Sequence, residues 1–480
     1  MAEKTEEQII YEAFTSGNNI LLHGPAGTGK TFSVNSLISS LKMRKDEDTS
    51  CSYVTAPTGM AANHINGTTI HFNFSIGALR DDMTKYAEVI PEYDYFEIKE
   101  RKGLELKYHN LVNEVVKKSS FRDRNLEYLF IDEISMVGAT ILIILDALLR
   151  NTIPNGRRKP MGGIQCIFCG DFYQLPPVKD EYCFNTKVWD ALNIVIVPML
   201  KCKRFGDDAT YFDMILRLRK GELTSEDKSV LMNRAQAFKD GEHLLKTIPP
   251  LELYPYNKNV ELINRRMLDS IEGPEYVFEC IDNISINERF VKGKYDLIKV
   301  NNEIDKVLDN SMPKTVSMRV GAQMILVRNY SVSDKLSNGR MFKVLSIDKV
   351  NQNNDDILED LLAEPEYQDQ IIVKNPLLYS IKILINDGTV HTINPISVKV
   401  EHKKFTCSRL QFPTMLAWAV TCHRSQGQTL ESAIVDASSS FTFGQSYVAL
   451  SRVTKIDNLF ISGLNFTKIK VNPEVRARFD

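Results

Sequence analysis

A glycine-rich octapeptide, GPAGTGKT from Gly24 to Thr31, is the first segment whose residue types and spacing suggest chemistry. It fits the pattern GxxxxGK[ST], with an apolar run before it and an amphipathic run after it, as this kind of loop requires. The glycines let backbone amides turn inward around a phosphate, Lys30 can reach the outer phosphates, and the Thr31 hydroxyl can ligate Mg²⁺. The segment therefore predicts a site for a nucleoside triphosphate with Mg²⁺.

Two adjacent carboxylates, Asp132 and Glu133, end the apolar run LEYLFIDE further along the chain. Asp132 is placed to hold Mg²⁺ through its hydration shell, and Glu133 to polarise an attacking water. The alternative is an ordinary exposed acidic strand end. Together with the glycine loop, the pair favours nucleotide hydrolysis.

The elements that must position these residues form an alternating pattern. Short apolar runs are separated by helical or polar stretches, as an open, mostly parallel α/β sheet requires. The helix after the glycine loop should turn Val34, Leu37, Ile38 and Leu41 toward one core face. A second set of runs predicts another α/β unit that begins near Pro198. The runs are NNILLH, CSYVTA, LEYLFIDE, GIQCIFCGD and NIVIVPML in the first set, and LELYPYN, SAIVDAS and LFISG in the second.

Length and charge limit the class of protein. The chain has 480 residues, 25% of them charged, with 59 Lys and Arg against 61 Asp and Glu. This excludes a disordered tail and a polycation, so any binding of nucleic acid must come from locally arranged charge.

The eight scattered cysteines indicate a reducing compartment, and Cys166 and Cys169 are interpreted as parts of a buried strand rather than a metal site. The N-terminus has no apolar signal segment and the longest apolar stretch, Val137 to Leu149, is too short for a bilayer, so we expect no membrane contact.

Two regions depart from the α/β pattern. Residues 315–400 show Val, Ile and Lys alternation with Ser-Asn-Gly and Asn-Asp-Gly turns. This predicts a small antiparallel β domain that interrupts the second α/β unit. Residues 80–125 form a charged insertion dotted with aromatic residues, without a clear period.

The longer motifs resemble those of a known family. In order and spacing they are similar to the motifs of superfamily 1B helicases, and most similar to the PIF-type (petite integration frequency) DNA helicases, relatives of RecD and Dda. The resemblance runs from about Gln8 to the end of the chain. The segments that carry it are GPAGTGKT, TAPTGMAANHINGTTIHF, IDEISMV, GDFYQLPPV, RLQFPTMLAWAVTCHRSQGQTL and FGQSYVALSRV.

The resemblance implies ATP and Mg²⁺ as cofactors and assigns roles to single residues. Gln8 would contact the adenine, and Gln174 would sense the γ-phosphate. Arg204 and Arg452 would be the arginines that meet the transferred phosphate, although Arg452 could also be an ordinary surface arginine. Gly138 stands where the family commonly has an Asp. The implied catalytic residues are Lys30, Asp132, Glu133, Gln174, Arg204 and Arg452; the nucleotide-binding residues are Gln8, Gly24, Pro25, Ala26, Gly27, Thr28, Gly29, Lys30 and Thr31; and the metal ligands are Thr31 and Asp132.

The remaining motifs are similar to those that bind the DNA strand in the family. Hydroxyl groups and imidazoles at helix starts can contact phosphates without reading base sequence. Aromatic rings could add stacking, although core packing is an equal alternative for Phe72, Phe74, Phe172 and Tyr173. The implied DNA-binding residues are Thr55, Thr58, His71, Phe72, Tyr173, Thr421, His423 and Ser425.

The implied fold is α/β, with two tandem RecA-like P-loop lobes that contain parallel sheets. Tyr93, Tyr95 and Phe96 are candidates for a pin that separates the strands of a duplex. The divisions are residues 1–79 and 126–198 for lobe one, 80–125 for an accessory insertion with the candidate pin, 199–314 and 401–480 for lobe two, and 315–400 for an SH3-like β insertion.

The expected function is an ATP-dependent 5′–3′ DNA helicase that translocates on single-stranded DNA and unwinds forked or 5′-tailed duplex in replication, repair or recombination. It is expected to act as a monomer on DNA, with single-strand-binding or replication proteins as partners. The expected location is the cytoplasm or nucleus, or a viral replication site. The alternatives are an RNA or RNA–DNA-hybrid helicase and a non-unwinding, ATP-gated DNA-binding factor.

Overall fold

The computed structural model describes most of the chain. The candidate pin residues Tyr93, Tyr95 and Phe96, and most of the predicted insertion, lie outside the described residues. Described are residues 4–44, 51–76, 123–205, 208–254, 257–287, 294–331, 333–334, 336–350, 366–367, 370–402, 405–438 and 440–480, together with Asn110, Asn113, Ser119 and Phe121.

The chain forms two compact units. Unit 1 comprises Met1–Leu223, Thr442–Val448 and Ile469–Asp480, and unit 2 comprises Thr224–Phe441 and Ala449–Lys468. Unit 2 thus begins at Thr224, whereas the sequence places the start of the second α/β unit near Pro198. The bounds of the two lobes stay a prediction.

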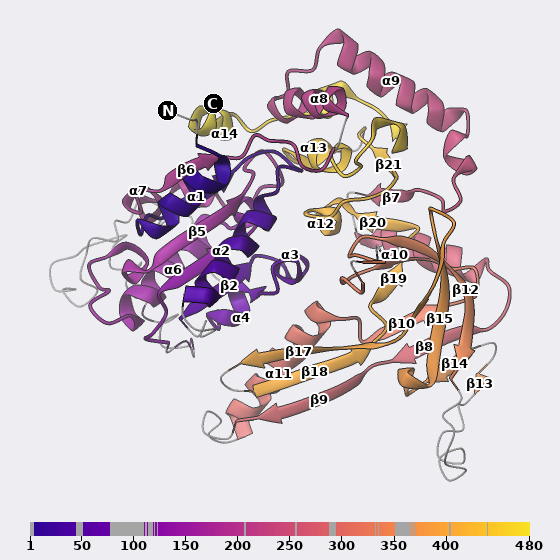
Figure 1. Cartoon of the computed structure of the whole chain (residues 1–480), viewed down its shortest axis with the longest axis horizontal. Coiled ribbons are helices and arrows are strands. Elements are labelled where there is room, and N and C mark those ends of the chain that lie inside the picture. Colours follow the sequence, from indigo (N-terminus) through magenta and orange to yellow (C-terminus); the bar gives the residue numbers. More distant parts are fainter. Residues whose placement is uncertain are drawn as a thin grey trace. The chain divides into compact units, whose positions relative to one another are not determined.

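Unit 1 contains a six-stranded parallel sheet in the order β3-β2-β4-β5-β1-β6. The predicted runs supply its five longer strands. Because β1 lies between β5 and β6, the glycine loop that follows β1 starts from an interior strand of the sheet. Figure 1 labels β5 and β6, the two strands that flank β1. The strands are β1 (Ile20–His23), β2 (Ser52–Ala56), β3 (Thr68–Thr69), β4 (Tyr128–Ile131), β5 (Gln165–Gly170) and β6 (Val195–Pro198).

Helices cover this sheet. Val34, Leu37 and Leu41 are buried in a core with Ile20 and Leu22 of β1, which confirms the predicted apolar face of the helix after the glycine loop. Burial of that face stabilises the helix more than its intrinsic propensity does. The helices of unit 1 are α1 (Glu6–Thr15), α2 (Lys30–Arg44), α3 (Gly59–His64), α4 (Ile70–Asn73), α6 (Ala139–Thr152), α7 (Lys187–Ala191), α8 (Ala209–Lys220) and α14 (Pro473–Phe479).

Helix α6 begins directly after Gly138, the residue that stands where the similar helicases commonly have an Asp. A Cβ atom at Gly138 would lie 2.0 Å from Oδ2 of Asp180, so a larger residue there would displace the Asp180 side chain. Asp180 accepts hydrogen bonds from the Thr140 backbone N–H and hydroxyl, both at 3.2 Å. A carboxylate from another segment thus satisfies the helix start, where negative charge is favourable.

Unit 2 contains a four-stranded parallel sheet in the order β20-β7-β21-β22. The predicted runs LELYPYN, SAIVDAS and LFISG supply three of its strands. The elements are β7 (Leu251–Tyr254), β20 (Ala419–Thr421), β21 (Ala433–Asp436) and β22 (Leu459–Gly463), with helices α9 (Ser225–Lys239), α10 (Asn257–Asp269), α11 (Lys294–Ser311) and α12 (Cys422–Ser425).

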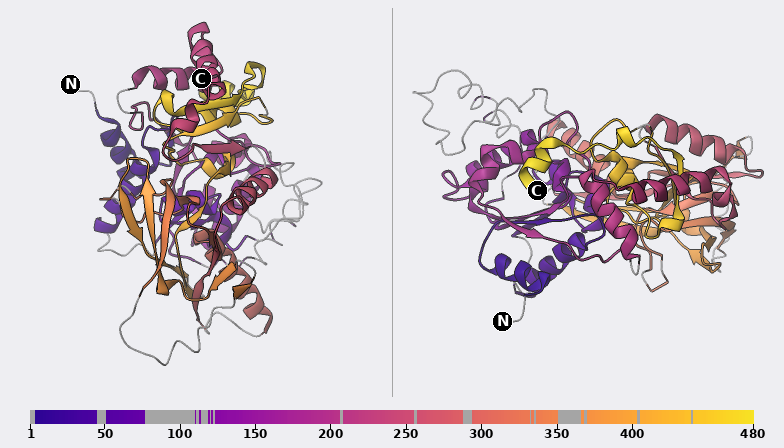
Figure 2. Two further views of the ribbon diagram at one scale, coloured as in Figure 1. Left: turned by 90° about the vertical axis from the view of Figure 1, so that its right-hand side faces the viewer. Right: turned by 90° about the horizontal axis from the view of Figure 1, so that it is seen from above.

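The rest of unit 2 is rich in antiparallel pairs. Strands β11, β12, β15 and β16 pair antiparallel in sequence order, as the alternation predicts, and Figure 2 shows these orange strands side by side. Strand β14, in the same region, pairs parallel with β8. An SH3-like topology stays a prediction. The strands are β8 (Glu275–Glu279), β9 (Ile281–Ile286), β10 (Thr315–Met318), β11 (Gln323–Leu326), β12 (Met341–Lys349), β13 (Glu366–Tyr367), β14 (Gln370–Val373), β15 (Tyr379–Ile385), β16 (Val390–Ile393), β17 (Ile396–His402), β18 (Phe405–Gln411) and β19 (Thr414–Leu416).

All eight cysteines are free thiols. Cys166 and Cys169 are fully buried in β5, as predicted. Among the residues that the structure describes, no group of three potential metal ligands from His, Cys, Asp and Glu occurs. No described helix combines the length and the apolar character needed to cross a bilayer.

Candidate nucleotide-binding site

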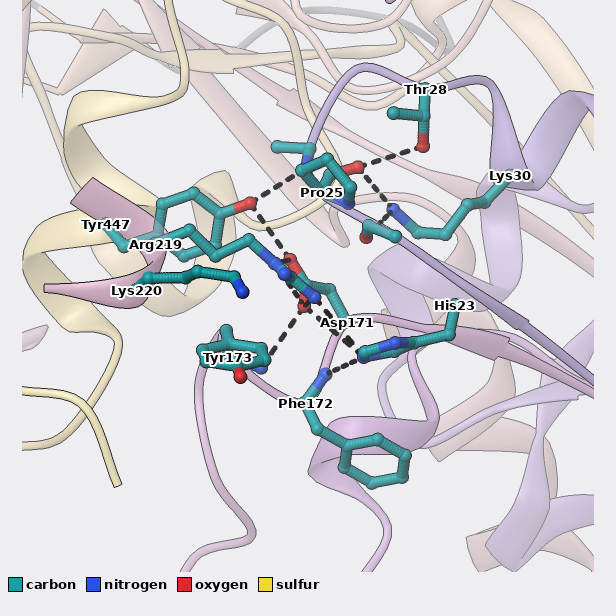
Figure 3. Close-up of polar contacts among 12 residues, drawn as sticks. His23, Pro25, Thr28, Lys30, Asp171, Phe172, Tyr173, Arg219, Lys220 and Tyr447 are labelled. Carbon is teal, nitrogen blue, oxygen red and sulfur yellow. Dashed lines mark hydrogen bonds and ion pairs between the residues drawn. The ribbon is translucent and has the colours of Figure 1, made fainter. Parts of the chain in front are cut away.

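The glycine loop connects β1 to α2 with a backbone that favours glycine. Gly27 and Gly29 have φ angles of +85° and +83°, a region that other residues rarely adopt. The Lys30 ammonium group donates hydrogen bonds of 2.8 Å to the carbonyl oxygens of Gly24 and Pro25 (Figure 3). The cation therefore lies across the loop, where it can exchange these carbonyls for phosphate oxygens. The loop fits a bound triphosphate.

Thr31 and Asp132 meet although they are far apart in sequence. The Thr31 hydroxyl donates to Oδ2 of Asp132 at 3.1 Å, and Asp132 is 3% exposed at the end of β4. A hydroxyl and a carboxylate side by side are the oxygen ligands that Mg²⁺ takes beside a phosphate. The two residues therefore fit the predicted metal position. Asp132 is further fixed because its Oδ1 accepts the Glu133 backbone N–H at 2.8 Å.

Glu133 occupies a left-handed backbone conformation, with φ 52° and ψ 46°. Such a conformation is uncommon for a residue with a side chain and is often found at functional sites. It turns the chain sharply after β4, so that Glu133 follows the metal position directly. A role in polarising water stays a prediction.

The segment 203–205 crosses the glycine loop. The backbone N–H groups of Lys203 and Arg204 both donate to the Gly27 carbonyl, at 2.8 and 3.0 Å. A Cβ atom at Gly27 would lie 2.7 Å from the Arg204 Cβ, so the close approach requires glycine. The structure thus brings Arg204 to the loop through its backbone, while contact of its guanidinium with phosphate stays a prediction.

Gln174 follows β5 and is 4% exposed. Its side-chain oxygen is buried and makes no hydrogen bond within the described part of the chain. A buried polar atom without a partner is costly, so its retention calls for an explanation such as a ligand. The predicted sensing role fits this feature and stays a prediction.

Gln8 lies in α1 and its side chain caps the helix. Its Oε1 accepts the Thr5 backbone N–H at 2.9 Å, while the Thr5 hydroxyl accepts the Gln8 N–H at 3.2 Å. This reciprocal pair fixes the start of α1. The adenine contact stays a prediction.

Arg452 belongs to unit 2. The side chain is 1% exposed, so it is not an ordinary surface arginine. Its guanidinium donates to the carbonyl oxygens of Ser425 and Gln428 at 3.2 and 3.3 Å and to the Ser451 hydroxyl at 3.1 Å. Arg452 thus holds the turn after α12 in place, and contact with a phosphate stays a prediction.

The predicted DNA-binding residues fall into distinct environments. Thr58 and Thr421 are helix caps whose hydroxyl oxygens accept the backbone N–H of Ala61 and Arg424, both at 3.2 Å. His71 is exposed and Phe72 is half-buried in the short helix α4. His423 is half-buried in α12, and burial lowers its pKa below the usual value near 6.5. These positions are compatible with strand contacts, which stay predictions.

Other predicted DNA-binding residues are buried in the protein interior. Thr55 is fully buried and donates to the Phe130 carbonyl at 2.8 Å, and the buried Ser425 donates to the Cys422 carbonyl at 2.9 Å. Tyr173 is 4% exposed, with the Arg219 guanidinium 4.0 Å from its ring centroid and its hydroxyl donating to Asp480. In this structure Tyr173 therefore offers no free face to a base.

The alternative of core packing also holds for two phenylalanines. Phe74 is fully buried against Tyr53 and Phe121. Phe172 is fully buried and stacks on Phe479 at 4.9 Å.

A charged cluster next to the loop was missed by sequence reasoning. Asp171, directly after β5, binds the Arg219 guanidinium of α8 through both carboxylate oxygens at 2.9 to 3.1 Å (Figure 3). Full burial alone would raise the pKa of Asp171, but the Arg219 guanidinium outweighs this effect and lowers it, so Asp171 stays ionised. The position of Asp171 after a parallel strand, as with Asp132, was the available signal. Arg219 had none, because its contact depends on the fold.

His23 completes this cluster as a neutral residue. Its Nε2 accepts the Phe172 backbone N–H at 3.4 Å, which requires the unprotonated nitrogen. Burial lowers the pKa of His23 from 6.5 to about 4. The charge of the cluster is therefore carried by Asp171 and Arg219 at neutral pH.

The fold and this loop define a P-loop nucleotide-binding domain, and residues 6–180 match the family described as AAA domain. Along 98% of its length the chain is 27% identical to the ATP-dependent DNA helicase PIF1 of Xenopus laevis, of which it covers 63%. The chain spans less than two thirds of this relative and of the PIF1 helicase of a Saccharomyces cerevisiae strain, with 60% of the latter covered.

A solved structure agrees with this similarity. The Pif1 helicase of Candida albicans is 27% identical, with a TM-score of 0.63, and the match covers 100% of this chain and 99% of that one. The resemblance to PIF-type DNA helicases is therefore confirmed along nearly the whole chain. The α/β fold with parallel sheets and a P-loop domain is confirmed as well.

Proposed function

We propose that this chain is an ATP-dependent DNA helicase that moves 5′ to 3′ on single-stranded DNA. The contact of Thr31 with Asp132, beside a glycine loop that Lys30 crosses, is the observation that carries the proposal. It unites a phosphate cradle with a metal position in one unit. The near full-length similarity to PIF1 helicases supports DNA as the track.

The residues in and around the glycine loop have separate proposed roles in ATP hydrolysis. When bound, Mg²⁺–ATP supplies the phosphoanhydride bond whose cleavage drives the cycle. Lys30 would exchange the carbonyls of Gly24 and Pro25 for phosphate oxygens, and Thr31 and Asp132 would hold the Mg²⁺ ion. Glu133 accepts a proton from the attacking water. Gln174, Arg204 and Arg452 are proposed to meet the γ-phosphate.

The proposed partners are single-stranded DNA and forked or 5′-tailed duplex, with the protein acting as a monomer. The proposed contacts with the DNA strand are the predicted residues that are exposed, are half-buried or cap a helix. They are Thr58, His71, Phe72, Thr421 and His423. These relatives come from a frog and two yeasts and lend no support to a viral replication site.

The test is an unwinding assay on duplexes with a 5′ or a 3′ tail, made of DNA or RNA. We expect ATP-dependent unwinding of the 5′-tailed DNA only, and none by the Lys30→Ala variant. Preference for the 3′ tail would refute the polarity. Stimulation by the RNA track alone would favour the RNA helicase, and ATP-dependent binding without unwinding would favour the ATP-gated binding factor.

A further inference from the structure

The Tyr447 hydroxyl lies between the glycine loop and the charged cluster of unit 1. It accepts the Ala26 backbone N–H at 2.8 Å and donates to Oδ2 of Asp171 at 2.9 Å (Figure 3). Tyr447 is 3% exposed, so bulk water does not compete for either bond. A single side-chain atom thus joins the main chain of the loop to a buried carboxylate.

The direction of these bonds is fixed by charge. Asp171 is held as a carboxylate by Arg219, so it can only accept hydrogen bonds. Burial raises the pKa of Tyr447 well above 10, so the phenol keeps its proton and gives it to Asp171. The hydroxyl oxygen can then only accept a further hydrogen bond, and the Ala26 backbone N–H donates it. The network therefore specifies one orientation of the Ala26 peptide.

Helix α13 (Gln445–Leu450) aims Tyr447 at this point. Gly444, directly before it, has φ +71°, and a Cβ atom there would lie 2.3 Å from the Gln174 carbonyl oxygen and 2.5 Å from that of Tyr173. The helix start is thus pressed onto the segment that follows β5. This contact fixes the position from which the ring of Tyr447 reaches the loop.

We propose that Tyr447 is a positioning residue for the nucleotide: by holding Ala26 it keeps the glycine loop in the form that receives phosphate. The proposal rests on the proposed ATPase function. Ala26 precedes Gly27 and Gly29, whose positive φ angles shape the cradle, so loss of its anchor should let the loop leave that shape. Nucleotide binding would then have to restore the loop, which weakens affinity.

The experiment compares Tyr447→Phe with Tyr53→Phe. Tyr53 is a matched control because its hydroxyl also donates to a carboxylate in unit 1, that of Asp123 at 3.2 Å, but it lies in β2. Binding of a fluorescent ADP analogue is titrated for the wild type and both variants, and the ATPase kcat and KM are measured. The melting temperature is recorded for each protein to show that it is folded.

We expect Tyr447→Phe to weaken ADP binding about tenfold, the value of one lost net hydrogen bond. The ATPase KM should rise by a similar factor, with a smaller change in kcat, and Tyr53→Phe should stay within about twofold of the wild type on the same scale. Hydrogen exchange adds a second readout: ADP should slow exchange in residues 445–450 of the wild type, and much less in Tyr447→Phe.

The proposal is overturned if Tyr447→Phe binds ADP like the wild type, or if both variants weaken binding equally. Helicase activity could survive either outcome. Conversely, a wild-type protein that binds ADP but does not turn over ATP would refute the proposed function and leave the positioning role standing on the binding data. If Tyr447→Phe does not fold, Tyr447→His takes its place, because the histidine ring can still accept a hydrogen bond. We expect this variant to bind ADP more weakly than the wild type but measurably. Complete loss of ADP binding by the folded variant would count against the proposal.

Discussion

The parallel sheets of the two units carry different chemistry at the ends of their strands. In unit 1, β1 leads into the glycine loop and β4 and β5 lead into Asp132 and Asp171. In unit 2, β20 leads into the short helix α12, which is capped by Thr421. Both arrangements use the carboxyl ends of parallel strands, where ligands of open α/β sheets bind.

The difference between the cations of the two units is instructive. Lys30 donates hydrogen bonds to two loop carbonyls, which a phosphate can replace without disturbing the core. Arg452 is buried and donates hydrogen bonds to two carbonyls and a hydroxyl of its own unit. Lys30 can therefore bind a phosphate at little structural cost, whereas Arg452 also stabilises the fold of its unit, whatever its proposed role at the phosphate.

The largest expected effect is that of Lys30→Ala, which tests whether the cation of unit 1 acts in function rather than in folding. We expect the DNA-stimulated ATPase to fall by more than about 100-fold, because the loop loses the cation that meets the phosphates. The melting temperature and single-strand binding should stay near the wild type, as in the control Lys239→Ala on the exposed end of α9. Retained turnover would sink the assignment of the site.

Arg452→Ala should behave in the opposite way with respect to folding. Its removal deletes the buried guanidinium hydrogen bonds to the Ser425 and Gln428 carbonyls, which should lower the free energy of unfolding by about 3 kcal/mol. Urea unfolding, with hydrogen exchange of unit 2 peptides, measures this. The exposed neighbour Arg424→Ala should cost less than about 0.5 kcal/mol. A fully stable Arg452→Ala protein would show that the comparison is mistaken.

The buried cluster of unit 1 should make its stability depend on pH. Because the pKa of His23 is lowered from 6.5 to about 4 in the folded protein, the unfolded chain binds the proton more readily. Stability should therefore fall as pH falls from about 6.5 to 4, by up to about 3 kcal/mol. Unfolding free energies of wild type and His23→Gln across this window measure the effect. An equal slope in both proteins would assign it to other groups.

The smallest expected effect is shared by the two units. Thr58→Ala and Thr421→Ala each remove a helix cap and should each cost about 1 kcal/mol, whereas serine at either position should retain most of the stability. Thermal unfolding of the four variants measures this. A cost at one threonine only would show that the two caps are not equivalent.

Much of this arrangement could be predicted from the sequence because it depends on local patterns. The glycine loop, the strand that ends in Asp132, and the apolar face of α2 each follow from neighbouring residue types. The Tyr447 and Arg219 contacts could not be predicted, because they join segments hundreds of positions apart or depend on how a helix packs. For Tyr173 the sequence leaves base stacking and core packing equally open, because its burial depends on contacts with Arg219 and Asp480 that the fold brings together.

The distribution of the thiols has a practical consequence for labelling the native protein. Six cysteines are buried, and burial raises the pKa of Cys166, Cys169 and Cys183, so they should resist maleimide dyes. Cys202 and Cys280 are partly exposed. Replacing Cys280 by serine should leave Cys202 as the preferred attachment point, one residue before the segment that crosses the glycine loop. A fluorophore there would report on the loop in single-molecule experiments without any engineered cysteine.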